Sequence, residues 1–316
     1  MKFSIIIPTY NSEHYIDNCL KHVLLLDYNK DDFEIIIVDG GSTDNTIRIA
    51  ESYNARVVPC SNICVSNSRN VGAEVALNDT LVFIDSDCLV NPDLLRKSVG
   101  HLSDFSCVGS YYKPSPDHSW IAKTWLLSEN RPSGEVRWLP AGTLIVRADD
   151  FNKVGGFNEG YIADEDVELC RRMRKHGFRI YNDKTISSIH LGQSDSISKF
   201  LEKEMWHASS NFRYLKDYGV KEEKFSVVLN LFFALIGVLL VMSLLTIQLA
   251  YVLASIGLWL GASGAFSLIK TYKITKLDPS LSKAGVLFRL FILFNLYLLA
   301  RFASIFKYKQ YKQLFT

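Results

Sequence analysis

Two carboxylates one residue apart, Asp85 and Asp87, follow a continuous apolar run at 81–84. Such a run is typical of a strand buried in a parallel sheet. Side chains two residues apart lie on the same side of a strand, so continued extended geometry would point both carboxylates the same way. Crowded carboxylates repel unless a cation lies between them, and Mg²⁺ and Mn²⁺ take oxygen ligands and often bridge to a phosphate. The pair predicts a metal–diphosphate site, with two solvated aspartates in a loop as the alternative.

Three further polar clusters lie where other predicted elements begin or end, at 8–11, 39–44 and, far downstream, 164–166. Apolar segments alternate with helical patterns along 1–102, which argues for an α/β fold with a mostly parallel sheet flanked by helices. Ligands of such sheets bind beyond the carboxyl ends of the strands. The site is therefore expected where 8–11, 39–44 and 85–87 meet.

Periodicity and turn residues predict the other elements. Strands are expected at 3–8, 33–38, 56–59, 80–84, 144–147, 179–181 and 186–190, and helices at 12–26, 46–53, 66–77, 93–102, 164–176 and 196–216. The stretch 111–138 contains three prolines and is expected to be a long loop. Loops of that length are often lids or binding loops.

The order and spacing of these clusters resemble family 2 of the inverting glycosyltransferases, which have the GT-A fold. The resemblance covers 2–217 and includes the segments 68–72, 142–147 and 151–159. It implies a GT-A domain at 1–217 that uses a nucleotide-sugar donor. Processive members carry a Gln-x-x-Arg-Trp pattern on a helix after the catalytic base, whereas 201–206 here reads Leu-Glu-Lys-Glu-Met-Trp. Transfer of a single sugar therefore fits better.

On the donor side, the resemblance implies that Asp39 accepts hydrogen bonds from the base or the ribose. The alternative for Asp39 is an Asx-turn cap. Arg69 would lie near the diphosphate, and the alternative for it is a charge on a helix surface. The whole implied nucleotide-binding set is Pro8, Thr9, Tyr10, Asp39, Arg69, Asp85 and Ser86.

The resemblance implies further that Asp87, with Asp85 and His190, holds Mn²⁺ or Mg²⁺, which neutralises the charge on the leaving nucleoside diphosphate. His190 would otherwise be a structural histidine at a strand end. Asp166 would be the general base that takes the proton from the acceptor hydroxyl as that oxygen attacks C1 of the sugar. Glu165 is the second candidate, and a negatively charged first helical turn without chemistry is the alternative for both. The implied sugar and acceptor region comprises Trp138, Ala141, Gly142 and Asp164.

Beyond about 224 the chain becomes strongly apolar. The runs 227–245 and 249–269 carry no charge, and each approaches the ~20 residues that span ~30 Å of hydrocarbon. We expect a membrane hairpin, with buried core helices as the alternative. A third run, 286–306, contains Arg289 and Arg301 and is expected to span the membrane or to lie in its interface.

Lysines within 270–276, directly after the hairpin, place that loop on the cytoplasmic side. Lysines within 307–312 argue against a crossing by the third run and favour an interfacial or re-entrant segment. The domain at 1–217 is then cytoplasmic, and 218–316 is the membrane region of a protein at the cell membrane. The N-terminus shows no signal-peptide pattern, and six cysteines without C-x-x-C spacing fit reduced thiols.

These observations favour an inverting, metal-dependent transferase that moves one sugar from a nucleotide donor to a lipid-linked or cell-surface glycan acceptor. A UDP-sugar is the donor that the resemblance favours. The net charge of +2 says little about partners, and no nucleic-acid partner is expected. A sugar nucleotidyltransferase is disfavoured because no glycine-rich basic loop follows the first strand. A non-catalytic, partner-binding membrane protein is disfavoured by the joint presence of Asp39, Asp85, Asp87, Glu165 and Asp166.

Overall fold

The structure, a computed structural model, describes residues 1–61, 64–208, 210–222 and 224–313. The chain divides into two compact units, one made of 1–117 with 129–193 and the other of 118–128 with the residues from 194 onward. The units change at 193–194, ahead of the domain boundary expected near 217, which stays a prediction.

The first unit is built on a mixed, mostly parallel sheet. Its strands are β1 (Phe3–Thr9), β2 (Phe33–Asp39), β3 (Arg56–Pro59), β4 (Thr80–Ile84), β6 (Cys107–Gly109), β7 (Gly134–Glu135), β8 (Thr143–Arg147) and β9 (Ile180–Asn182). Their order is β3-β2-β1-β4-β8-β6-β9-β7. β3, β2, β1 and β4 run parallel, β6 and β9 run parallel, β8 opposes β4 and β6, and β7 opposes β9. A separate ladder joins β5 (Cys88–Leu89) to β10 (Ile189–His190).

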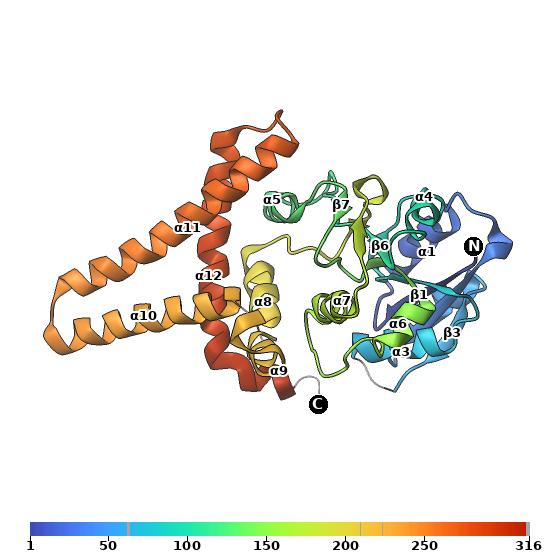
Figure 1. Cartoon of the computed structure of the whole chain (residues 1–316), viewed down its shortest axis with the longest axis horizontal. Coiled ribbons are helices and arrows are strands. Elements are labelled where there is room, and N and C mark those ends of the chain that lie inside the picture. Colours follow the sequence, from blue (N-terminus) through green and yellow to red (C-terminus); the bar gives the residue numbers. More distant parts are fainter. Residues whose placement is uncertain (62–63, 209, 223, 314–316) are drawn as a thin grey trace. The chain divides into compact units, whose positions relative to one another are not determined.

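Helices pack on both faces of this sheet (Figure 1), which confirms the expected α/β fold. They are α1 (Ile16–Leu24), α2 (Thr46–Ser52), α3 (Val65–Glu74), α4 (Leu94–His101), α6 (Ala148–Lys153) and α7 (Glu165–Lys175), with 3₁₀ turns η1 (Lys30–Asp32) and η2 (Lys184–Ile186). Side chains of β1 alternate between two cores, Ile5 with Leu20 of α1 and Ile6 with Met173 of α7. Helix α3 lies so close to β1 that a Cβ at Gly72 would meet Ile6 Cγ2 at 2.3 Å.

The strand register brings the ends of several strands to one edge of the sheet. Thr9 pairs with Asp39 across β1 and β2, and Cys60, just after β3, donates its N–H to the Asp39 carbonyl at 2.8 Å. Ile84 at the end of β4 pairs with Thr143 at the start of β8. The residues that follow β1, β2 and β4 therefore meet, as the alternation of strands and helices predicts.

The expected long loop at 111–138 is wrong in part, because it contains helix α5 (Trp120–Glu129). The prolines of the stretch lie outside the helix, and the Ser119 hydroxyl accepts a hydrogen bond from the Ala122 N–H at 3.4 Å, as an N-cap does.

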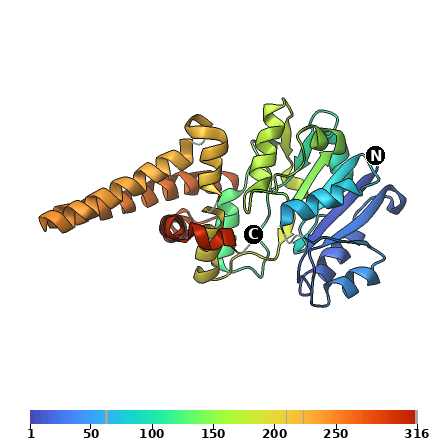
Figure 2. The same ribbon diagram turned by 90° about the horizontal axis from the view of Figure 1, so that it is seen from below.

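The second unit is helical. Besides α5 it contains α8 (Ile197–Ala208), α9 (Asn211–Glu222), α10 (Lys224–Thr246), α11 (Leu249–Leu277) and α12 (Lys283–Gln313). One helix was expected over 196–216, but two occupy this stretch. Helices α10 and α11 form an antiparallel hairpin with a turn at 247–248 (Figure 1), which Figure 2 shows from below.

Two helices among the described residues are long and apolar enough to cross a membrane, 249–277 and 283–304, and 231–246 is a shorter apolar helix. Both the second helix of the expected hairpin and the third apolar run are thus long and apolar enough to cross a membrane. Arg301 within it pairs with Glu204 of α8 at 3.2 Å. The side chains of the lysines at 307–312 lie outside the described residues, and the membrane topology stays a prediction.

All six cysteines lie in the described part of the chain, and none of them forms a disulfide. Five are buried, and Cys64, which directly precedes α3, is half-buried. This agrees with the thiols that their spacing predicts.

Candidate active site

Asp85 and Asp87 are brought together by a turn rather than by a strand. β4 ends at Ile84, and the Cys88 N–H donates to the Asp85 carbonyl at 2.9 Å. The Asp85 N–H donates in turn to the Gly142 carbonyl at 3.4 Å, which ties the turn to the segment before β8. The expectation of continued extended geometry was wrong, although the two carboxylates do meet.

Four potential ligands gather at this turn. Asp85, Asp87, Cys88 and His190 each offer one atom, and these atoms lie within 4.8 Å of one another. His190 arrives there because β10 pairs with β5, which places His190 opposite Cys88. Its Nδ1 lies 3.4 Å from Asp87 Oδ2, and its Nε2 lies 4.0 Å from Asp85 Oδ2. The sequence prediction that Asp85, Asp87 and His190 lie together agrees with this geometry.

The potential metal ligands Asp85, Asp87 and His190 are named the donor set. Their ligand atoms fit a hard divalent cation. Two carboxylates and an imidazole are common ligands of Mn²⁺, and carboxylates suit Mg²⁺. Burial, followed by the charges of Asp87 and Asp85, raises the pKa of the Cys88 thiol well above its usual range. A thiol is also a soft ligand, whereas these cations favour oxygen ligands, so Asp85, Asp87 and His190 carry the fit.

Two glycines leave room for this set. A Cβ at Gly192 would lie 2.1 Å from Asp87 Oδ2, and a Cβ at Gly142 would lie 2.2 Å from the Tyr112 hydroxyl and 2.4 Å from Asp85 Oδ2. Real side chains do not approach so closely. Both carboxylates thus occupy positions that only a neighbouring glycine permits.

We expect Gly192→Ala to displace the Asp87 carboxylate and to weaken Mn²⁺ binding by about tenfold or more, the usual cost of disturbing the surroundings of a metal ligand. Titration of the purified protein with Mn²⁺ would measure it. Gly100→Ala is the control, because Gly100 lies within α4 with no atom within 4 Å of its added Cβ. Unchanged Mn²⁺ affinity in Gly192→Ala would contradict the prediction.

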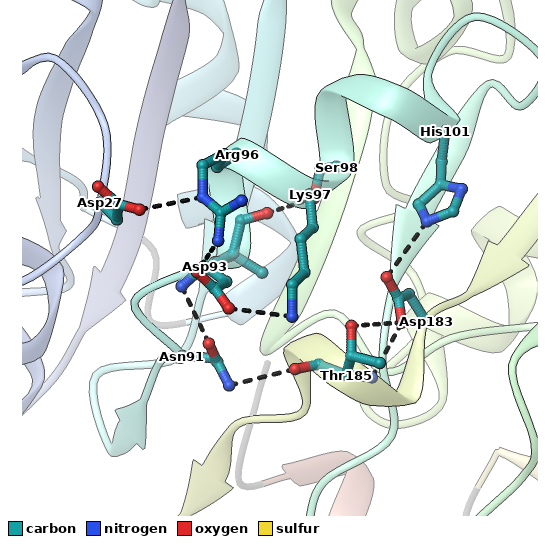
Figure 3. Close-up of polar contacts among 10 residues, drawn as sticks. Asp27, Asn91, Asp93, Arg96, Lys97, Ser98, His101, Asp183 and Thr185 are labelled. Carbon is teal, nitrogen blue, oxygen red and sulfur yellow. Dashed lines mark hydrogen bonds and ion pairs between the residues drawn. The ribbon is translucent and has the colours of Figure 1, made fainter.

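A polar network secures the segment that precedes His190 (Figure 3). Asp183 accepts from the Thr185 N–H at 2.9 Å and from its hydroxyl at 2.8 Å, and lies 3.2 Å from His101 Nε2 on α4. Asn91 donates to the Thr185 carbonyl at 3.2 Å. Burial alone would raise the pKa of Asp183, but the hydrogen bonds from Thr185 and the contact with His101 lower it. The charged form of Asp183 thus anchors η2, and η2 leads into β10.

Arg69 of α3 is buried, which excludes a charge on the helix surface. Only 3% of it is exposed. Its Nη1 donates to Glu165 Oε1 and its Nη2 donates to Asp85 Oδ1, both at 2.6 Å. Arg69 therefore joins the turn at 85–88, which carries candidate metal ligands and is named the metal loop, to the first turn of α7. Its implied role beside the diphosphate stays a prediction.

Asp166 contacts the same segment 141–142 that bonds to Asp85. Its Oδ2 accepts from the Ala141 N–H at 3.1 Å, and its Oδ1 accepts from the Val167 N–H at 2.7 Å. Asp164 begins α7 in a left-handed conformation, with φ 59°. Burial, followed by the charges of Glu165 and Asp164, raises the pKa of Asp166 well above its usual range, against the opposing effect of Arg69. Such a carboxylate is a stronger base than an ordinary one.

A raised pKa at a general base has a definite pH signature. The base acts when deprotonated, so kcat/KM should rise with pH through a limb above the ordinary aspartate pKa of about 4. Asp164→Asn removes a neighbouring negative charge, and asparagine tolerates the left-handed region, so the limb should move to lower pH. The exposed Asp149 of α6 supplies the control Asp149→Asn, which should leave the limb in place. An unmoved limb in Asp164→Asn would contradict the assignment.

The proposed nucleotide edge contains Asp39 as the cap of a tight turn. One of its oxygens accepts from the N–H groups of Gly41 at 2.9 Å and Ser42 at 2.8 Å, and the other accepts from the hydroxyls of Ser42 at 2.5 Å and Thr9 at 3.3 Å. The Asx-turn alternative is therefore present in the structure, and a contact with the base stays a prediction. Tyr10 beside it is 51% exposed.

The remaining predicted residues are Pro8 and Ser86, which were expected to bind the nucleotide, and Trp138, which was expected to contact the sugar or the acceptor. Pro8 lies in β1 and pairs with Val38 of β2. The Ser86 hydroxyl lies 3.0 Å from that of Ser12. Trp138 packs edge to face on Tyr111, with ring centroids 5.2 Å apart. Sugar and acceptor contacts of these residues stay predictions.

Two residues of the site, Tyr112 and Cys88, were not predicted from the sequence. The Tyr112 ring lies edge to face against His190, with centroids 4.7 Å apart. Burial raises the pKa of Tyr112 well above its usual range, and Cys88, Asp85 and Asp87 add to the shift. Tyr112 sits in the stretch expected to be a loop, so only its aromatic character in a possible binding loop pointed to it. Cys88 follows Asp87 directly, and that adjacency was a usable signal.

Comparison with known proteins gives matches to glycosyltransferases. Residues 4–156 match the sequence model of the family described as Glycosyl transferase family 2. The poly(ribitol-phosphate) beta-N-acetylglucosaminyltransferase TarS of Staphylococcus aureus is 36% identical over 110 residues, which cover 33% of this chain and 19% of TarS. The validoxylamine A glucosyltransferase of Streptomyces hygroscopicus subsp. limoneus is 28% identical over 217 residues, which cover 55% of this chain and 48% of the relative. The chain thus spans from about a fifth to about half the length of these relatives.

A third relative and one solved structure extend further along the chain. A dolichyl N-acetyl-alpha-D-glucosaminyl phosphate 3-beta-D-2,3-diacetamido-2,3-dideoxy-beta-D-glucuronosyltransferase of Methanococcus voltae is 23% identical over 235 residues, covering 66% of this chain and 72% of that protein. The mannosyltransferase PcManGT from Pyrobaculum calidifontis, solved in complex with GDP-Man and Mn²⁺, covers 98% of this chain and 87% of its own, with TM-score 0.63 and 17% identity. Residues 4–156 thus match glycosyltransferase family 2, and the chain shares the GT-A fold of the Pyrobaculum structure.

Proposed function

We propose that the protein is an inverting, metal-dependent glycosyltransferase that moves a single sugar from a nucleoside diphosphate donor to an acceptor hydroxyl. The observation that supports this most is the two-residue segment Ala141–Gly142. Ala141 bonds to the proposed base Asp166, and Gly142 bonds to Asp85 of the donor set. A base and a cation site held by adjacent residues suit a reaction in which attack and departure occur on opposite sides of one carbon.

On the donor side, Asp85, Asp87 and His190 would hold Mn²⁺ or Mg²⁺. When bound, the cation supplies positive charge to the diphosphate as it leaves. The exposed ring of Tyr10 offers a face to the base, next to the turn that Asp39 caps. The diphosphate would then lie between this turn and the donor set.

On the acceptor side, Asp166 is the general base, and its raised pKa favours it for taking a proton from a hydroxyl. Glu165 is less suited, because Arg69 already holds its carboxylate and it is only 6% exposed. Attack from the side opposite the leaving diphosphate inverts the configuration at C1.

The acceptor is proposed to be a lipid-linked or cell-surface glycan at the cytoplasmic face of the cell membrane. Helices α11 and α12 support this through the length and apolar character of their segments. The name of the Methanococcus voltae relative specifies a dolichyl phosphate-linked acceptor, and an exposed apolar hairpin would keep a catalytic domain near such a substrate.

Calorimetry with UDP, GDP and dTDP, each with Mn²⁺ and with EDTA, tests the donor site in the detergent-solubilised protein. We expect one nucleotide to bind with Mn²⁺ and to bind far more weakly with EDTA, because the cation neutralises the diphosphate. A UDP preference is our expectation, and GDP is the competitor named in the Pyrobaculum complex. If a folded sample bound none of the three, the proposed function would be wrong.

A further inference from the structure

Arg69 joins two parts of the site that the proposed reaction uses separately. Its Nη1 and Nη2 each lie 2.6 Å from a carboxylate oxygen, the first of Glu165 at the start of α7 and the second of Asp85 in the metal loop. Arg69 and Glu165 are 3% and 6% exposed. A guanidinium presents its donors in a fixed planar fork. One planar group therefore bonds to both the helix that carries the proposed base and the loop that carries the proposed metal ligands.

The arrangement also divides one positive charge between two carboxylates. Interactions of this kind are stronger in the protein interior than in water, because the effective dielectric constant is lower. If Glu165 were neutral, the charge of Arg69 would act on Asp85 alone. Asp85 would then offer less negative charge to a cation at the donor set.

We propose that Glu165 and Arg69 are positioning residues that tune the divalent-cation site from the base helix. Glu165 holds Arg69 and shares its positive charge, so that Arg69 lowers the effective negative charge of Asp85 less than it would alone. This inference rests on the proposed function, because it requires the set of Asp85, Asp87 and His190 to hold a cation. It differs from the role that family resemblance implies for Arg69, which is a contact with the donor diphosphate.

The two variants have opposite expected effects on cation binding. Glu165→Gln should weaken Mn²⁺ binding by about 10- to 100-fold, the usual range for partners of metal ligands. Arg69→Met removes the positive charge beside Asp85, so Mn²⁺ should bind at least as tightly as to the parent protein. A diphosphate contact predicts another pattern, in which Arg69→Met weakens donor binding and Glu165→Gln leaves Mn²⁺ affinity unchanged.

A matched control lies three residues further along the same helix. Glu168 is 0% exposed and bonds to Arg172 at 2.7 and 2.6 Å, but neither residue belongs to the donor set. Glu168→Gln should lower the Tm and leave Mn²⁺ affinity unchanged. Arg69→Gln serves if Arg69→Met fails to fold, because it also removes the positive charge while its amide can still donate to one carboxylate, and the same parent-like or tighter Mn²⁺ binding is expected.

The experiment is Mn²⁺ binding to the nucleotide-free whole chain in detergent, followed by electron paramagnetic resonance of the free ion, with a thermal melt of each variant. Weakened binding in Glu165→Gln, with parent-like or tighter binding in Arg69→Met, is the expected result. Parent-like binding in Glu165→Gln would overturn this inference and leave the proposed function standing. Failure of the folded parent protein to bind Mn²⁺ would overturn both.

Discussion

Asp166→Asn should leave the nucleotide donor bound and reduce transfer by about 10²- to 10⁴-fold, the range that a general base contributes. Asparagine has nearly the same shape, and its oxygen can still accept from the Ala141 or the Val167 N–H, the two donors that hold Asp166. It cannot take a proton from the acceptor. The loss should therefore appear in kcat, with little change in the Kd for the donor.

Single-turnover rates and donor titrations of the same preparations would measure the two effects separately. Asp164→Asn is the control, since it changes an adjacent carboxylate in the same way and should keep most of the turnover at neutral pH. If Asp166→Asn turned over at a near-parental rate, Asp166 would not be the base. Nucleophilic activation would then have to come from another group.

Asp87→Ala should abolish the Mn²⁺ dependence of nucleotide binding. Asp87 lies 3.4 Å from His190 Nδ1 and belongs to the cluster of potential ligands. Without it the cation loses a charged ligand, and the diphosphate loses the charge that neutralises it. We expect the Kd for the nucleotide in the presence of Mn²⁺ to rise about 100-fold, toward its value with EDTA.

Calorimetry with and without EDTA measures this change. The exposed Asp31 of η1 provides a charge-matched control, because Asp31→Ala removes one carboxylate away from the donor set. If a folded Asp87→Ala protein still bound the nucleotide in a Mn²⁺-dependent way, the metal or the nucleotide would bind elsewhere in the protein.

The sequence predicted the parallel half of the sheet well because that half depends on local signals. The runs that became β1, β2 and β4 are short, apolar and bounded by turn residues, and each was expected within a residue or two of its observed end. Polar residues directly after such strands must meet at one edge of a parallel sheet. This rule sufficed to bring Asp39 and Asp85 to the same edge.

The other half of the site depends on contacts across long stretches of chain. Arg69 meets Glu165 across 96 positions and Asp85 across 16, and no periodicity reports such pairs. A strand was expected at 186–190, but only Ile189–His190 form one, and nothing local in the sequence predicts its antiparallel pairing with β5 or the 2.8 Å bond from the Leu191 N–H to the Asp87 carbonyl. The sequence predicted that extended backbone would bring Asp85 and Asp87 together. In the structure a turn brings them together instead.

The distribution of cysteines makes this protein convenient for site-selective chemistry. Five thiols are enclosed by the fold and only Cys64 is partly open to solvent. A thiol-reactive fluorophore added to the native protein should therefore attach mainly there, since reaction requires access to the sulfur. Cys64 directly precedes the helix that carries Arg69, so a dye at this point would report whether that helix moves when donor is added. The unmodified chain thus offers one accessible position for a fluorescent label.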